Sequence, residues 1–460
     1  MSTWVEFYNE IKDASWPECD NEGQFDSLPD HIQQECINVF GYTPGQFKKT
    51  SKLVNRIFPI KTDTACQLKW NWSTIFLTTE ETASCHRTNH HKFNTDEFDF
   101  HNTPEKLHDR ERMLQGQWPE RGCSYCQDIE HAGGQSDRIT NLDFPGIHAP
   151  PELDIDLTAT SVTPRILEVY FDNTCNLKCL YCGPYFSSLW DAENVKFGTR
   201  AFDKSTNIDS NKHKIFNWLR EHGHKLTNFN ILGGEPLYQQ ELDQCLKLFE
   251  QHPAPELKLQ IFTNLNAKLE RVQRMVEQVK RLIDMGGIRE FEVTASLDCW
   301  GPEQEYVRFP LNLAVWQTNF EYLLSQPWIN LIVSSTITPL TVKTLPDLLK
   351  KLQTWNQTRT VYHYQNSVNG PDHMFIDIFG DVFSEDFDRA LALKPECTTE
   401  QQSSKNYLAG IARQARSKSP NIPMIQKLHQ FLNQMDQRRN TNWRETFPWL
   451  VNEFGKYQLD

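Results

Sequence analysis

The sequence predicts an α/β protein built around a parallel sheet, and three features of residues 160–384 lead to this class. Short apolar segments recur along this part of the chain. All but the last are followed by a longer segment whose apolar residues are spaced three and four apart, as on one face of a helix. Strand and helix alternate over six units, and such units form a parallel sheet with right-handed crossovers. Periodicity alone leaves a partial barrel and an open, doubly wound sheet as alternatives.

The strands and helices of this region can be placed from their apolar patterns. Strands are expected at 165–171, 229–233, 257–264, 290–298, 330–338 and 360–365. Helices are expected at 212–223, 242–252, 269–285, 313–326 and 345–355. In such an architecture the functional loops gather at the carboxyl ends of the strands.

The region before the sheet lacks the regular alternation of strands and helices. Residues 1–57 carry short helical patterns and form a lead-in module whose role the sequence does not reveal. Residues 58–150 open with a strand-like segment, 67–79, and continue into an amphipathic segment, 105–118. The prolines of 145–154 indicate a linker, because they interrupt regular structure.

The region after the sheet, residues 385–460, is a helical and hydrophilic C-terminal extension. It ends in an aromatic stretch, 443–454, that we expect to pack back on the core.

Composition narrows the class of protein further. An apolar content of 38% can build a sizeable core, and the net charge of −13 argues against a general binder of nucleic acid or anionic membranes. The first residues lack the pattern of a signal peptide, and no apolar window approaches the ~20 residues of a membrane span. We therefore expect a cytoplasmic protein whose 12 cysteines stay reduced and whose clustered cysteines bind metal.

Three cysteines follow the first strand of the series directly. Cys175, Cys179 and Cys182 are spaced C-x3-C-x2-C. Three thiolates from one loop can hold three irons of a [4Fe–4S] cluster and leave the fourth iron open to another ligand. The alternative is a structural zinc site that takes a ligand from elsewhere, but structural zinc usually uses paired CxxC or HxxxH elements. The spacing therefore favours the cluster.

This cysteine pattern, with Tyr181 just before the last cysteine, resembles the radical S-adenosylmethionine (SAM) superfamily over about residues 164–370. The resemblance implies a partial (β/α)6 TIM-type barrel, which would settle the alternative left open above. It also implies that one electron from the reduced cluster cleaves SAM to methionine and a 5′-deoxyadenosyl radical, which abstracts a hydrogen atom from the substrate. The electron would come from a donor such as a flavodoxin or a ferredoxin.

The resemblance also implies cofactor contacts at the next strand end. The motif after the second strand consists of Gly233, Gly234, Glu235 and Pro236. Glycines let the backbone approach a ligand closely. In the family this motif meets the methionyl amino group of SAM, here near Glu235.

Further cofactor contacts are implied after the third and fourth strands. Asn264 matches a position that often contacts the ribose, and Ser296 and Asp298 offer polar groups to the ribose or the carboxylate. Arg308 is expected to clamp the carboxylate, because a guanidinium fork matches carboxylate geometry. For Asn264, Ser296 and Asp298 the alternative is ordinary capping at strand ends.

Two cysteines stand outside the clusters of this region. Cys245 lies among apolar residues of a helix and is expected in the core. Cys299 directly follows Asp298, so it is a candidate donor of a hydrogen atom to a substrate radical, with a buried structural thiol as the alternative.

A second set of cysteines precedes the sheet. Cys66, Cys85, Cys123 and Cys126 are spaced C-x18-C-x37-C-x2-C. Four thiols can close a tetrahedral zinc site or hold a [4Fe–4S] cluster completely, and spacing alone favours zinc. The flanking residues, however, resemble the twitch or SPASM-like extensions of some radical SAM proteins, which bind auxiliary clusters. In well-described enzymes the twitch extension follows the barrel, whereas here it precedes it.

We therefore expect a second, auxiliary [4Fe–4S] cluster in residues 58–150, with zinc as the alternative. The nearby histidines, His86, His90 and His91, are either an unusual ligand source or surface residues of a polar loop.

The function expected from these features is that of a radical SAM oxidoreductase with an auxiliary cluster, acting on a peptide or protein side chain. Radical SAM oxidation of a small molecule (an alcohol, an aminocyclitol or a nucleotide) is one alternative. A nucleic-acid-modifying enzyme is another, although the acidic balance disfavours it. A non-catalytic, metal-stabilised binding protein is a third alternative. It would not explain the glycine motif, or a cysteine triplet that leaves one iron open. The sequence names no substrate.

Overall fold

The computed structural model describes residues 64, 66–85, 88–120, 122–131, 136, 138, 160–394 and 399–459. The predicted lead-in module at 1–57 and the predicted linker at 145–154 lie outside these residues. The chain divides into two compact units. Unit 1 comprises Met1–Ile75, Glu80–Leu167 and Lys225–Asn228, and unit 2 comprises Phe76–Thr79, Glu168–His224 and Phe229–Asp460. The domain boundaries drawn from the sequence stay predictions.

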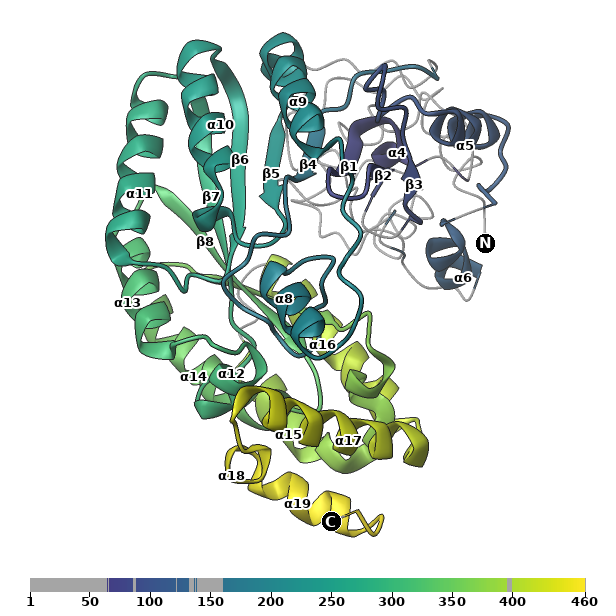
Figure 1. The fold of residues 1–460 in the computed structure, drawn as a ribbon, viewed down its shortest axis with the longest axis vertical. Helices are drawn as coiled ribbons and strands as arrows, with labels where there is room; N and C mark the ends of the chain where they lie inside the picture. The colour runs from purple at the N-terminus through teal and green to yellow at the C-terminus, as the bar shows by residue number, and fades with distance from the viewer. Residues whose placement is uncertain are drawn as a thin grey trace, which may run out of the picture. The chain divides into compact units, whose positions relative to one another are not determined.

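The protein is an α/β fold with a nine-stranded, mostly parallel sheet in the order β3-β2-β1-β4-β5-β6-β7-β8-β9 (Figure 1). The strands are β1 (Trp72–Phe76), β2 (Glu81–Ala83), β3 (His91–Lys92), β4 (Ile166–Tyr170), β5 (Asn228–Leu232), β6 (Ala254–Thr263), β7 (Ile288–Ser296), β8 (Ile329–Ile337) and β9 (Tyr362–Ser367). All six strands predicted from the apolar pattern are present as β4 to β9. β2 and β3 pair antiparallel.

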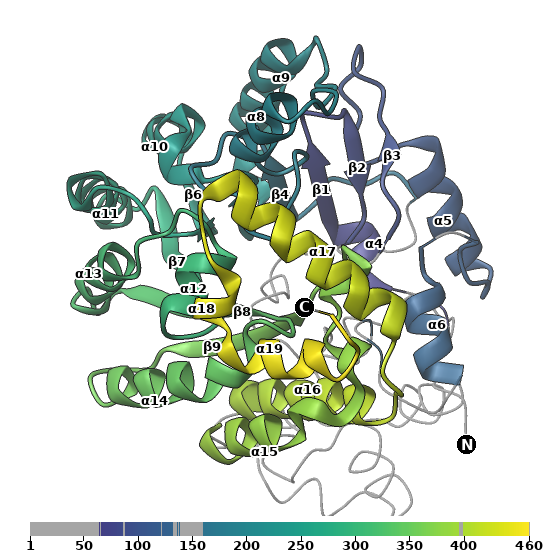
Figure 2. The same cartoon turned by 60° about the horizontal axis from the view of Figure 1, so that its bottom comes forward.

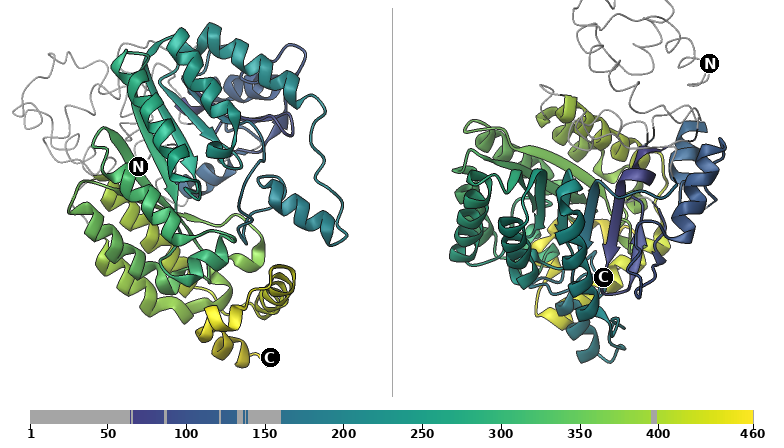
Figure 3. Two further views of the ribbon diagram at one scale, coloured as in Figure 1. Left: turned by 60° about the vertical axis from the view of Figure 1, so that its left-hand side comes forward. Right: turned by 90° about the horizontal axis from the view of Figure 1, so that it is seen from above.

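Five helices between these strands lie where the sequence predicts them: α9 (Ile208–His222), α10 (Gln240–Gln251), α11 (Leu269–Asp284), α13 (Leu313–Leu324) and α14 (Leu345–Asn356). The structure adds α8 (Ser188–Lys196) and α12 (Pro302–Val307), which the sequence analysis did not predict. The described residues also contain the 3-10 helices η3 (Gly223–Lys225), η4 (Pro236–Tyr238), η5 (Val342–Thr344), η6 (Asp372–Met374) and η7 (Ile376–Phe383). Figure 2 shows α10, α11, α13 and α14 as an outer row beside β6 to β9, and the left panel of Figure 3 looks onto these teal and green helices.

The two faces of the sheet in unit 2 differ in chemistry because side chains alternate along a strand. On one face Ile261 pairs with Val293, which pairs with Leu331, and all three side chains are buried. On the other face Gln260 donates a hydrogen bond to Thr294 Oγ1 at 2.9 Å. The apolar face is the one that the amphipathic helices cover, and the strand ends carry the candidate site.

The C-terminal extension is helical, as predicted. It consists of α15 (Ser384–Leu393), α16 (Thr399–Arg416), α17 (Ile422–Arg439), α18 (Trp443–Thr446) and α19 (Pro448–Gly455). Its aromatic end packs inward: Trp443, Phe447 and Phe454 are at most 1% exposed. The Phe447 ring lies edge-on to Tyr306 of α12, with 5.2 Å between the ring centroids. The prediction that residues 443–454 pack on the core is confirmed.

Unit 1 contains α4 (Gln67–Asn71), α5 (Pro104–Leu114) and α6 (Ser124–His131). The predicted strand at 67–79 is wrong in its first half, because 67–71 is helical and only β1 is extended. The backbone turns at Cys66, whose carbonyl accepts a hydrogen bond from the Lys69 N–H at 2.9 Å. This turn lets alternating polar and apolar residues, which resemble a strand in sequence, be buried together on a short helix.

Among the described residues, no helix combines the length and the apolar character that a membrane crossing requires.

Candidate functional site

The cysteine triplet lies on the loop between β4 and α8. The Leu177 N–H donates to Cys175 Sγ at 3.4 Å, and the Cys182 N–H donates to the Cys179 carbonyl at 2.9 Å. Ser187 caps α8 by accepting a hydrogen bond from the Trp190 N–H. The loop is therefore held by its own backbone and by the start of the helix that follows it.

The three thiols are poorly solvated, and the charge of one affects the pKa of another. Burial raises the pKa of Cys182 to about 12, and the neighbouring Cys179 contributes to this. Burial also raises the pKa of Cys175, again with contributions from Cys179 and Cys182. Thiolates are metal ligands, and such buried thiols become thiolates at neutral pH only when a cation compensates their charge.

The glycine motif packs on the backbone of this loop. The Glu235 N–H donates to the Thr174 carbonyl at 2.8 Å. Gly234 has a φ of +54°, and a Cβ at this position would lie 2.1 Å from the Thr174 carbonyl oxygen. Gly233 has a φ of +86°, and a Cβ there would lie 2.9 Å from the Tyr170 ring. Only glycine fits both the backbone conformation and the approach to the residue before Cys175. Pro236 begins η4 and is buried.

The Glu235 side chain is completely buried and holds the neighbouring strand end. Its carboxylate accepts hydrogen bonds from Thr263 Oγ1 and the Asn264 N–H, both at 2.6 Å, and from the Leu237 N–H at 3.1 Å. Burial raises the pKa of Glu235 to about 7, although these three hydrogen bonds act in the opposite direction. The carboxyl is thus poised to titrate near neutral pH.

Asn264 connects the third strand end to the cysteine loop. Its Nδ2 donates to Asn176 Oδ1 at 2.9 Å and lies 3.9 Å from Cys175 Sγ. Asn176 in turn donates to the Asn266 carbonyl at 2.7 Å. The structure therefore brings Asn264 beside the first cysteine of the triplet, and it adds Asn176, which the sequence reasoning did not single out.

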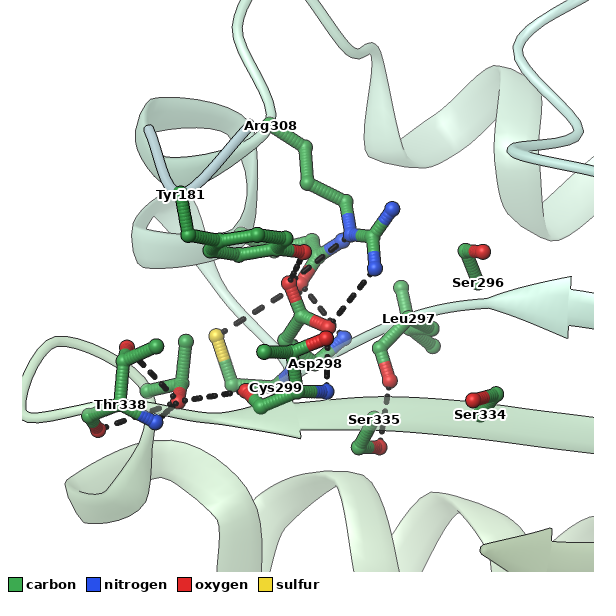
Figure 4. Close-up of polar contacts among 12 residues, drawn as sticks. Tyr181, Ser296, Leu297, Asp298, Cys299, Arg308, Ser334, Ser335 and Thr338 are labelled. Carbon is green, nitrogen blue, oxygen red and sulfur yellow. Dashed lines mark hydrogen bonds and ion pairs between the residues drawn. The ribbon is translucent and has the colours of Figure 1, made fainter. Parts of the chain in front are cut away.

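Asp298 and Arg308 form a buried ion pair beside Tyr181 (Figure 4). Arg308 Nε and Nη2 donate to the two oxygens of Asp298 at 2.8 and 2.9 Å. Tyr181 donates to Asp298 Oδ2 at 2.6 Å, and the Thr336 N–H donates to Oδ1 at 2.8 Å. Asp298 therefore holds Arg308 and Tyr181 in place, and Figure 4 shows one terminal nitrogen of Arg308 outside the pair.

Ser296 and Cys299 lie on either side of Asp298 in sequence. Ser296 ends β7 opposite Ser334 of β8 in the sheet register, and Figure 4 labels both serines apart from the ion pair. Cys299 is 0% exposed, and its thiol donates to Gln304 Oε1 at 3.7 Å. Complete burial is the setting of a structural thiol, and the role of Cys299 as a hydrogen-atom donor stays a prediction. Cys245 is likewise 0% exposed on α10, as predicted for a core residue.

The four cysteines of unit 1 line one cavity. Its walls are formed by Cys66, Leu68, Lys69, Ser84, Cys85, Met113, Trp118, Gly122, Cys123, Cys126 and Arg138. Burial and the neighbouring Cys85 raise the pKa of Cys66 to about 12 and that of Cys123 to about 11. Four sulfurs spread over the sequence from 66 to 126 therefore converge on one enclosed space.

Two cations also line this cavity. Lys69 is 3% exposed and forms an ion pair with Asp109 of α5. Burial lowers the pKa of Lys69, but the charges of Cys123 and Asp109 outweigh it and the net pKa is raised. Arg138 forms an ion pair with Glu130 of α6. Each of these cations is therefore already paired with a carboxylate.

The histidines near Cys85 do not turn toward this cavity in the described part of unit 1. His90 is exposed, and His91 Nε2 lies 2.8 Å from Thr103 Oγ1. His86 lies outside the described residues. Among the described residues, no group of three or more His, Cys, Asp or Glu side chains is gathered closely enough to hold a single metal ion.

By residue type, the two sets of cysteines suit the groups that the sequence implies, because thiolates are ligands of both iron–sulfur clusters and zinc. The loop carries three thiols beside the glycine motif, and the carboxylate and amide side chains next to it are the kinds of group that bind an amino acid and a ribose. The cavity of unit 1 is lined by four thiols, and Lys69 and Arg138 line it as well.

Comparisons with known proteins are sparse. No protein-family profile matches the chain, and no curated protein matches it. Thirteen chains of solved structures match, among them one described as "Native anSMEcpe with bound AdoMet and Kp18Cys peptide". That match has 14% sequence identity and a TM-score of 0.33, and it covers 49% of this chain and 57% of the other. The chain thus spans little more than half of that protein, and the match is too remote to place any residue or activity.

Proposed function

We propose that this chain is a radical SAM enzyme whose parallel sheet is a partial (β/α)6 barrel. The observation that carries the proposal is the packing of the glycine motif on the cysteine loop. Gly234 touches the residue before Cys175, and Glu235 and Asn264 are joined by a 2.6 Å hydrogen bond in the same place. Glu235 and Asn264 belong to one polar group beside Cys175, and Asp298, Arg308 and Tyr181 form a second one in unit 2.

The triplet would hold a [4Fe–4S] cluster with one open iron for SAM. When bound together, the cluster and SAM supply a one-electron cleavage of SAM to methionine and a 5′-deoxyadenosyl radical. The protein's own residues bind and orient. Cys175, Cys179 and Cys182 hold three irons, and burial of their loop excludes water from a site where a radical must be protected.

The polar residues around the triplet would orient SAM. Glu235 accepts a hydrogen bond from the amino group with its buried carboxylate, and Asn264 offers its amide to the ribose. Arg308 directs its free terminal nitrogen to the carboxylate of SAM, while Asp298 and Tyr181 keep the guanidinium in a fixed orientation. Ser296 adds a hydroxyl at the end of β7.

The quartet of unit 1 would hold an auxiliary [4Fe–4S] cluster, with zinc as the alternative. A closed site of four thiolates cannot bind SAM, so its role is to accept an electron from the product radical or to stabilise the fold. The substrate class to test first is a peptide or protein side chain, because the resembling enzymes with such extensions often act on peptides. A flavodoxin or ferredoxin would supply the electron.

The proposal is tested by anaerobic reconstitution of the full chain followed by reduction in the presence of SAM. We expect about eight irons per chain if both sites hold clusters, and about four irons with one zinc if the quartet binds zinc. Reduction should release 5′-deoxyadenosine and methionine. A reconstituted protein that binds four or more irons but does not cleave SAM overturns the proposed activity.

A further inference from the structure

A buried arginine of the C-terminal extension reaches the cysteine loop. Arg439, the last residue of α17, is 8% exposed. Its Nη2 donates to Glu193 Oε1 of α8 at 3.1 Å, and its Nε lies 3.3 Å from both oxygens of that carboxylate. Its guanidinium carbon lies 4.6 Å from the centre of the Trp190 ring and 5.6 Å from that of Phe309. The guanidinium is thus fixed by an ion pair and two aromatic rings.

The residues that fix Arg439 also fix the loop. Trp190 Nε1 donates to the Cys179 carbonyl at 2.7 Å. The Phe309 carbonyl accepts a hydrogen bond from the Lys178 N–H at 2.7 Å. The Lys178 side chain forms an ion pair with Glu193. Each of the residues that contact Arg439, namely Glu193, Trp190 and Phe309, is therefore bonded in turn to Lys178 or Cys179 of the loop.

The charges in this group do not cancel. Lys178 and Arg439 share a single carboxylate, Glu193, so the three side chains carry a net charge of +1. The other arginine near the triplet, Arg308, is neutralised by Asp298.

One N–H group of Arg439 has no partner. Within the described part of the chain, the buried Nη1 has no hydrogen-bond acceptor. A buried, charged donor without an acceptor is costly and therefore uncommon. An anionic group bound at the adjacent loop would supply what the protein does not.

We propose that Arg439 is a positioning residue for the iron centre of the triplet, and that its fixed positive charge raises the reduction potential of that centre. This inference rests on the proposed function. A [4Fe–4S] cluster with three thiolates is anionic and becomes more so when it gains one electron. A cation in a site of low dielectric constant stabilises the reduced form more than the oxidised form. No bond forms or breaks in this step, and a low-potential one-electron reductant supplies the electron.

The test compares variants that change the net charge of the group in both directions. Arg439→Met lowers it from +1 to 0, whereas Glu193→Gln raises it to +2, and the double variant restores +1. Each full-length protein is reconstituted anaerobically, and its reduction is followed by electron paramagnetic resonance during titration with dithionite. The centre of the triplet is recognised as the one whose signal changes when SAM is added, because only that site has an open iron.

The expected shifts have opposite signs. Arg439→Met should disfavour reduction about tenfold, which is a potential about 59 mV more negative for a one-electron couple. Glu193→Gln should shift the potential to more positive values, and the double variant should lie near the wild type. Arg439→Lys, which keeps the charge, should also remain near the wild type.

A matched control is next in the chain. Arg438 of α17 contacts Asn194 at 3.3 Å and the Phe197 ring at 4.9 Å, which places it toward the far end of α8. Arg438→Met should leave the potential unchanged. If Arg439→Met shares the wild-type potential, or if Arg439→Lys shifts as far as Arg439→Met, the inference is overturned.

Two further outcomes need their own interpretation: a variant that does not fold, and a wild-type protein that takes up no iron. If Arg439→Met does not fold, Glu193→Gln still decides the question, because an unchanged or more negative potential in that variant contradicts a stabilising cation. If the wild type takes up no iron at the triplet, the proposed function fails and this inference fails with it. An iron-loaded wild type with insensitive variants overturns the inference alone.

Discussion

The chain builds its two cysteine sites in opposite ways. The triplet comes from one loop of unit 2, and backbone hydrogen bonds to Cys175 and between Cys179 and Cys182 hold it locally. The quartet comes from separate segments of unit 1 between residues 66 and 126, and its sulfurs meet only because that unit folds. One site is a local motif and the other is a product of tertiary structure.

The surroundings of the two sites differ as well. Beside the triplet lie polar groups that can bind a ligand, such as Glu235 and Asn264. The cavity of the quartet is lined by apolar residues, including Met113 and Trp118, and by the cation Lys69. The first environment suits the SAM-binding cluster that we propose, and the second suits the closed centre that we propose for the quartet.

The sharpest way to break this comparison is to remove each site in turn. Replacing Cys175, Cys179 and Cys182 by alanine should abolish 5′-deoxyadenosine formation while about half of the iron remains. Replacing Cys123 and Cys126 should leave some SAM cleavage but stop product formation. Circular dichroism checks that each variant is folded, since loss of a metal site can unfold a small unit. A folded protein without the triplet that still cleaves SAM would show that the two sites are assigned wrongly.

The packing of the glycine motif on the cysteine loop is tested at Gly234. An alanine there would adopt an unfavourable positive φ and meet the Thr174 carbonyl at 2.1 Å. We expect a loss of about 2–5 kcal/mol in the free energy of unfolding, from backbone strain and overpacking together. Iron at the triplet should fall while iron at the quartet is retained.

Gly286 provides the matched control for this substitution. It also has a positive φ, +74°, but a Cβ there meets nothing within 4 Å. Gly286→Ala should cost only about 1–2 kcal/mol and leave the iron content unchanged. Equal costs for the two alanines would mean that the glycine motif does not pack on the loop.

The stability of the protein should depend on pH through Glu235, which lies beside the triplet. Burial raises the pKa of Glu235 from 4.5 to about 7. Between these values the native protein binds more protons than the unfolded protein, so its stability should fall as the pH rises from about 4.5 to about 7. The full effect is about 3 kcal/mol. Thermal unfolding of the metal-free protein at several pH values measures it, and Glu235→Gln should flatten the profile.

SAM binding should have the opposite pH dependence, because the ionised carboxylate accepts the stronger hydrogen bond from the amino group. Glu235→Ala should weaken SAM binding by about 1.5–3 kcal/mol without removing iron, since the carboxylate orients the ligand and does not hold the cluster. Titration of the reconstituted protein with SAM measures the affinity. An unchanged affinity with an intact cluster would remove Glu235 from the site.

The smallest effect is expected at a cysteine outside both sites. Cys245 is buried in α10 among apolar side chains, where it acts as a small hydrophobic residue. Cys245→Ala should cost about 1–2 kcal/mol of stability and leave iron content and SAM cleavage unaltered. A loss of iron in this variant would mean that a cysteine beyond the two clusters serves as a ligand.

The sequence by itself determined the strand and helix order and the positions of the strand ends. Apolar spacing located β4 to β9 because a strand or helix that buries one face must repeat its apolar residues at the matching period. It also placed Glu235 and Asn264 at neighbouring strand ends, because parallel strands present their carboxyl ends at one edge. It misassigned residues 67–71, where a strand-like alternation folds into a short helix whose residues are buried together.

Only the tertiary structure decided which polar groups face each other. The sequence offered Asp298 and Arg308 as two separate ligand contacts, but the fold pairs them in a buried bidentate bridge. It gave no indication of Arg439, because α8 and α17 are distant in sequence and meet only through packing. Periodicity reports which side of an element is buried, whereas the partner of a buried charge depends on the whole chain, because a charge removed from water must find its counter-charge wherever folding places one.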